Sequence, residues 1–122
     1  PALYNLASVY VGLSREEGAQ VEGFGLSLLE AQASGVAVVA GAGGGTSDAV
    51  THGVTGFVVE TADEHPAATV VRRLLQDPSL SRVLGQAGRA RAEREFAWSR
   101  VVRDLEEAAA GFRADWLGRG GR

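Results

Sequence analysis

The sequence predicts an α/β domain built on a parallel sheet that is flanked by helices, with a helical C-terminus. Short apolar runs alternate with segments of helical periodicity, which is the pattern of parallel strands joined by helices. One run, residues 36–40 (VAVVA), is apolar without a break, as is typical of a strand covered on both faces. The length of 122 residues fits one domain.

Three strands are expected in this sheet. Residues 8–13 and 55–60 are rich in β-branched and aromatic side chains, and residues 36–40 form the strand between them. Residues 2–7 have the composition of a helix end. A doubly wound sheet normally has about five or six strands. We therefore expect further strands of the same sheet before residue 1.

Helices are expected between and after the strands. They cover residues 25–34, 48–52, 65–76 and 79–95, and a last helix capped by Ser99 ends near Phe112. Gly35 suits the left-handed position that ends a helix. Asp77 and Pro78 supply a capping side chain and a proline at the first helical position. Thr46 or Ser47 can cap the second helix.

The end of the chain is expected to be less ordered. Phe96 and Trp98 mark a break between the last two helices, and both rings are expected to be buried. Residues 113–122, which end in GRGGR, are expected to form a flexible tail.

Composition excludes several classes of protein and site. The absence of cysteine excludes a disulfide scaffold and a cysteine zinc site. Two histidines, His52 and His65, argue against a histidine metal site, so no metal is expected. The sequence contains no run of about 18 apolar residues, so no transmembrane helix is expected. No signal peptide opens the chain, and cytoplasm is the expected location.

Charge is distributed unevenly. Residues 1–66 carry eight acidic side chains and one arginine, a net charge of −7, whereas residues 67–122 carry eleven arginines and seven acids, a net charge of +4. A basic half can bind nucleic acid or an anionic membrane. No aromatic residues are interleaved with these arginines as platforms for base stacking. We therefore favour a solvated helical surface and expect no nucleic-acid partner.

A candidate binding site lies at residues 22–30 (EGFGLSLLE). Ligands of open α/β sheets bind beyond the carboxyl ends of the strands, where this segment follows the first strand. Gly23 and Gly25 let the backbone approach a ligand closely. The amides of Phe24, Gly25 and Leu26 are expected to be free at the start of a helix, where phosphate is the usual anion.

Two carboxylates flank this helix start. Glu22 and Glu30 are eight positions apart, about two turns along nearly the same face. Glu30 lies in an apolar stretch, LLEAQA, where a carboxylate is costly without a partner such as a sugar diol. From the residues alone, an ordinary half-exposed helix glutamate and a favourable loop acid near a helix N-terminus remain open alternatives.

A second loop, GAGGG at residues 41–45, does not fit a dinucleotide motif. Thr46 replaces the last glycine of the pattern, and no acidic residue follows in the required context. Gly44 and Gly45 can still form a backbone nest for a ligand, although a plain flexible turn fits equally well. Arg15 in the first loop can meet a phosphate or remain solvated.

The stretch from Ser14 to Ala40 resembles the donor-site signature of retaining glycosyltransferases of the GT-B fold, family 4 (glycosyl transferases group 1). The hallmark of that signature is a pair of glutamates separated by seven residues, here Glu22 and Glu30. Similar motifs follow in order at residues 44–50 (GGTSDAV), 52–59 (HGVTGFVV), 77–89 (DPSLSRVLGQAGR) and 96–101 (FAWSRV). The resemblance therefore covers nearly the whole chain.

The resemblance implies specific roles. A hexose would be transferred from a UDP-sugar or GDP-sugar with retention of configuration, without a metal or other cofactor. Glu22 would act as the catalytic residue that holds the hydroxyls of the transferred sugar. The segment from Gly23 to Leu26, with its Phe24 and Gly25 amides, would cradle the diphosphate, and Glu30 would bind the ribose hydroxyls.

The resemblance also implies that the chain is incomplete. Residues 1–112 would form part of a Rossmann-like donor domain that is inactive without its N-terminal acceptor domain. The first loop is similar to that of mannosyltransferases with lipid acceptors, which indicates GDP-mannose and peripheral membrane association of the parent enzyme. Ser47 and Asp48 depart from the family's usual Pro-Glu. The alternatives are a non-catalytic α/β interaction or assembly module and a GT-B relative such as a sugar-nucleotide epimerase.

Overall fold

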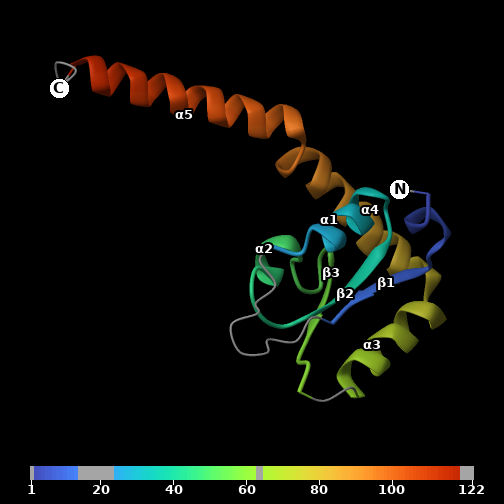
Figure 1. Ribbon diagram of the computed structural model, residues 1–122. Helices are drawn as coiled ribbons and strands as arrows, with labels where there is room; N and C mark the ends of the chain where they lie inside the picture. The colour runs from blue at the N-terminus through green and yellow to red at the C-terminus, as the bar shows by residue number, and fades with distance from the viewer. Residues whose placement is uncertain (1, 14–23, 63–64, 119–122) are drawn as a thin grey trace.

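A computed structural model describes residues 2–13, 24–62 and 65–118 and contains a three-stranded parallel sheet. The strands β1 (Val9–Gly12), β2 (Ala37–Gly41) and β3 (Gly56–Val59) lie side by side in the order β1-β2-β3 (Figure 1). Val9 pairs with Ala37, and Val38 pairs with Gly56. The predicted α/β class and parallel sheet are confirmed.

The helices surround the sheet and extend beyond it. They are the short 3₁₀ helix η1 (Tyr4–Leu6) and the α-helices α1 (Leu26–Ala33), α2 (Thr46–Ala49), α3 (His65–Gln76), α4 (Pro78–Glu95) and α5 (Trp98–Gly118). Two predicted boundaries are confirmed. Gly35 follows α1 with φ +75°, and a carboxylate oxygen of Asp77 accepts the Leu80 amide at 3.0 Å at the start of α4.

Other predicted boundaries are wrong. Helix α2 begins at Thr46 with Gly45 at its N-cap, so Thr46 and Ser47 lie inside the helix instead of at its N-cap. Its early start has a backbone cause, because Gly43 and Gly44 take φ values of 131° and 51° and turn the chain within the glycine run. Ser99 lies inside α5 instead of capping it, and α5 continues to Gly118, through part of the segment expected to be a tail.

The core has two halves, one on each face of β2, and all five residues of β2 are buried. Val38 and Ala40 belong to a first cluster with residues of α1 and α2, whereas Ala37 and Val39 belong to a second cluster with residues of α3 and α4. This alternation follows from the two-residue period of a strand. The expectation of a strand covered on both faces is therefore confirmed.

Helix α4 approaches the turn between α1 and β2 closely enough to require glycine. A Cβ atom on Gly85 would lie 2.1 Å from the backbone oxygen of Gly35, and one on Gly88 would lie 2.9 Å from Cγ of Gln32. Real Cβ atoms do not approach other atoms this closely. The glycines at these positions therefore set the distance between α4 and the rest of the fold.

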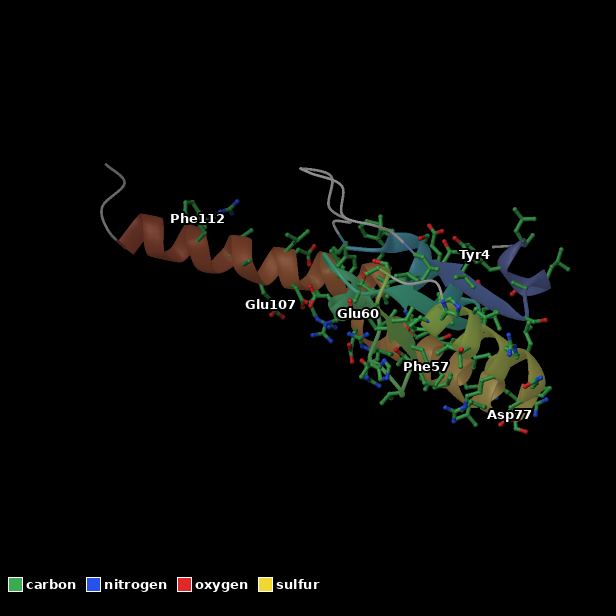
Figure 2. The ribbon with its side chains drawn as sticks, turned by 90° about the horizontal axis from the view of Figure 1, so that it is seen from below. Tyr4, Phe57, Glu60, Asp77, Glu107 and Phe112 are labelled. Atoms are coloured by element: carbon green, nitrogen blue, oxygen red, sulfur yellow. The ribbon has the colours of Figure 1, made fainter. Side chains whose placement is uncertain are left out.

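Helix α5 projects away from the α/β unit (Figures 1 and 2). Its exposed apolar side chains include Phe112, which is labelled in Figure 2. Trp98 is 81% exposed, so the prediction that its ring is buried is wrong, whereas Phe96 is partly buried against the first cluster. No helix within the described parts of the chain combines the length and apolarity needed to cross a bilayer.

We predict that Gly85→Ala destabilises the fold by about 3 kcal/mol, because the added methyl group collides with a backbone carbonyl that cannot move aside. Urea unfolding followed by circular dichroism measures this difference. Gly111→Ala is the matched control, since nothing lies within 4 Å of a Cβ at that position of α5. Equal free energies of unfolding for the two variants would contradict the close approach.

Candidate functional site

The candidate site lies where β1 and β2 end at the same edge of the sheet. Parallel pairing brings their carboxyl ends together, with Gly12 opposite Ala40. The chain leaving β1 leads to α1, and the chain leaving β2 leads to α2. The two helices meet beyond this edge, because a Cβ on Gly25 would lie 3.7 Å from Cβ of Ala49.

Gly25 shapes the start of α1. It occupies the N-cap with φ 74° and ψ 49°, a left-handed conformation that glycine adopts without strain. Its carbonyl accepts the amides of Leu28 and Leu29 at 2.9 and 3.2 Å. Leu26 is 68% exposed. The first amides of a helix have no carbonyl partner within the helix, so the amides at the start of α1 are candidate donors for a ligand.

Phe24 anchors the approach to this helix. Its ring packs against Phe96 with the ring centroids 5.7 Å apart. The Arg91 guanidinium lies 5.2 Å from the centroid of the Phe96 ring, and Nε of Arg91 donates to Glu95 at 2.8 Å. Hydrogen bonds from Arg94 and Arg91 hold the pKa of Glu95 below its usual value. The end of α4 therefore braces the residue that precedes Gly25.

Two side chains hold α2 beside α1. The buried amide of Gln32 donates to the carbonyl oxygens of Ala49 at 2.9 Å and Leu28 at 3.3 Å. Arg91 donates to the carbonyls of Ala49 and Asp48 at 2.9 and 2.8 Å. These contacts satisfy the carbonyls at the end of α2. Sequence reasoning missed them, although the glutamine within an apolar helix was a signal that could have indicated a buried partner.

Glu30 lies one turn beyond Leu26 on the exposed side of α1. The hydroxyl of Tyr4 donates to Oε2 of Glu30 at 2.9 Å. This hydrogen bond, with partial burial and the nearby carboxylate charge, raises the pKa of Tyr4. No sequence motif assigned Tyr4 to the candidate site. The one available signal was general: a partly buried tyrosine hydroxyl usually has a hydrogen-bond partner.

The structure thus brings together Phe24, Gly25, Leu26 and Glu30 at the start of α1. Gly44 and Gly45 lie in the turn that leads into α2, which packs beside α1. Three other predicted site residues lie outside the described residues. They are Arg15, Glu22 and Gly23.

His52 makes contacts with the strand β3. Nδ1 of His52 lies 3.1 Å from the amide nitrogen and 3.0 Å from the carbonyl oxygen of Val58. Its ring packs on Phe57. Across residues 2–13, 24–62 and 65–118, no three histidine or carboxylate side chains are grouped so that they could hold a metal ion.

Comparison with known proteins gives relatives over most of the chain. Residues 1–91 match the family described as glycosyl transferases group 1. A GDP-mannose-dependent alpha-(1-6)-phosphatidylinositol monomannoside mannosyltransferase of Mycolicibacterium smegmatis is 40% identical over 115 residues, 93% of this chain and 30% of that protein. A GDP-mannose-dependent mannosyltransferase of Corynebacterium glutamicum, which the name assigns to monoacylated alpha-(1-6)-phosphatidylinositol monomannoside, is 45% identical over 70% of this chain and 22% of its own length.

A solved structure shares the fold. Sucrose-phosphate synthase from Thermosynechococcus elongatus superimposes with a TM-score of 0.82 at 33% sequence identity, over 93% of this chain and 27% of that chain. The chain thus spans less than a third of each of these three proteins. The family match covers well over half of the described sequence, and it agrees with the motifs at residues 14–40. The chain belongs to the group 1 glycosyl transferases.

Proposed function

We propose that this chain is the donor-binding part of a retaining glycosyltransferase that transfers a hexose from a nucleotide sugar. The observation that carries the proposal is the exposed start of α1 at Leu26, followed one turn later by the carboxylate of Glu30. A helix N-terminus attracts phosphate, and a carboxylate accepts hydroxyl protons. A nucleoside diphosphate presents both groups, so it fits this pair of features.

The family signature supports a role for each residue. The backbone from Gly23 to Leu26 receives the diphosphate, while Glu30 accepts the ribose hydroxyls. Glu22 is the catalytic residue that holds the sugar. Backbone amides and arginine side chains, Arg15 among them, balance the diphosphate charge without a metal. The turn at Gly44 and Gly45 forms the opposite wall of the donor site.

We propose GDP-mannose as the donor. Two relatives with 40% and 45% identity bear names that specify GDP-mannose, and both names specify a phosphatidylinositol mannoside as the other substrate. The acceptor would therefore carry lipid and lie at a membrane surface. The parent enzyme would supply a separate acceptor domain, act in the cytoplasm and meet the membrane peripherally. The chain alone would be inactive, because half of the cleft would be missing.

We predict that Glu30→Ala weakens GDP binding at least about tenfold in the complete enzyme that carries this chain, because hydrogen bonds to a charged group are lost. Isothermal titration calorimetry with GDP and with UDP measures the effect and identifies the base. Glu107→Ala is the matched control, since it removes the same charge from the projecting helix α5 (Figure 2). Equal GDP affinity in both variants would argue against the donor site.

We predict that Glu22→Gln lowers the rate of mannosyl transfer by about a hundredfold or more while GDP affinity stays within about twofold of wild type. Its carboxylate is proposed to act on the sugar, which GDP lacks, and interactions made in the transition state govern the chemical rate. Product formation from GDP-mannose gives the rate, and calorimetry gives the affinity. Unchanged transfer would refute the catalytic role, and transfer replaced by epimerisation would identify a different GT-B activity.

A further inference from the structure

We infer that Tyr4 is a positioning residue, which orients the Glu30 carboxylate so that it accepts the two vicinal hydroxyls of a ribose. This inference rests on the proposed function of Glu30. Tyr4 lies in η1, outside the segment that holds the two signature glutamates. Through Glu30, it would help the site to bind ribonucleotides more tightly than deoxyribonucleotides.

The contact that carries the inference joins two distant segments of the chain. Oη of Tyr4 lies 2.9 Å from Oε2 of Glu30, and the two residues are 26 positions apart. Among the residues that the structure describes, Tyr4 is the one hydrogen-bond partner of this carboxylate. An exposed glutamate otherwise samples several rotamers, and ligand binding must then oppose that entropy. A hydrogen bond present before binding removes part of that cost.

Tyr4 is suited to hold another side chain still. Its ring packs edge-on against Tyr10, with centroids 5.5 Å apart and an angle of 62° between the ring planes. The ring also packs against the first cluster, and the Tyr4 carbonyl accepts the Ala7 amide at 2.9 Å to close the turn of η1. Tyrosine has only two side-chain dihedral angles. The hydroxyl therefore sits at a well-defined point beside α1, where it donates to Glu30.

The carboxylate keeps enough acceptor capacity for a diol. An ionised carboxylate has about four lone-pair sites, and the Tyr4 hydroxyl occupies one of them on Oε2. Oε1 remains for one ribose hydroxyl, and the second site of Oε2 remains for the other. A tyrosine phenol is protonated at neutral pH, and the hydrogen bond to Glu30 raises the pKa of Tyr4 further.

The test compares Tyr4→Phe with Tyr10→Phe in the complete enzyme, with GDP and 2′-deoxy-GDP as probes. Tyr4→Phe retains the ring but loses the hydroxyl, so we expect about three- to tenfold weaker GDP binding. The ratio of the 2′-deoxy-GDP to GDP dissociation constants should fall by a similar factor. Tyr10→Phe removes the neighbouring hydroxyl and leaves the Tyr4–Glu30 hydrogen bond intact, so both values should stay at wild type.

Glu30→Ala separates this inference from the function on which it rests. If Glu30→Ala binds GDP like wild type, the proposed ribose site fails. If Glu30→Ala weakens binding but Tyr4→Phe keeps the wild-type affinities and ratio, the role of Tyr4 is overturned. In the Glu30→Ala background, Tyr4→Phe should have no further effect, because the two side chains act as one unit.

A measurement on the unmutated protein covers the case in which Tyr4→Phe does not fold. With ¹³Cζ-labelled tyrosine, the Tyr4 resonance should move on saturation with GDP, and the Tyr10 resonance should move less. The phenol of Tyr4 should titrate at lower pH in Glu30→Ala than in wild type, because its acceptor is gone. An unchanged titration and an unmoved resonance would overturn the inference.

Discussion

Both faces of strand β2 are buried, because its side chains alternate between two apolar clusters. Once Val38 faces the first cluster and Val39 the second, helices must cover both sides. Parallel pairing then brings the carboxyl ends of β1 and β2 to one edge. The start of α1 and the glycine turn before α2 therefore lie beyond this edge. The burial of β2 thus determines where the candidate site lies.

Helix α4 connects this core to the site. Its first half meets the α1–β2 turn through Gly85, where a carbonyl leaves room for hydrogen alone. Its last turns carry Arg91, which binds the carbonyls at the end of α2 and covers the ring of Phe96. A helix that contributes no proposed ligand contact therefore sets both the spacing of the framework and the placement of the glycine turn.

The sequence predicted those features that depend on residues close together in the chain. The uninterrupted apolar run of β2, the Asp77–Pro78 start of α4 and the start of α1 after Gly25 each depend on neighbouring residues, and all three appear in the structure. The failures involve long-range contacts or backbone conformations. Trp98 was expected inside because of its size, yet α5 carries it away from the core. The Tyr4–Glu30 hydrogen bond spans 26 residues, so no periodicity could reveal it.

The projecting helix has a hydrodynamic consequence. The 21 residues of α5 extend roughly 30 Å, about the diameter of a small domain, and they project from the α/β unit instead of packing on it. A chain of this shape diffuses and sediments as an elongated particle. On a sizing column calibrated with compact standards, a monomer would elute early, at an apparent mass above its true 12.7 kDa. Early elution alone would therefore be no sign of a dimer, and light scattering or sedimentation equilibrium would be needed to count subunits.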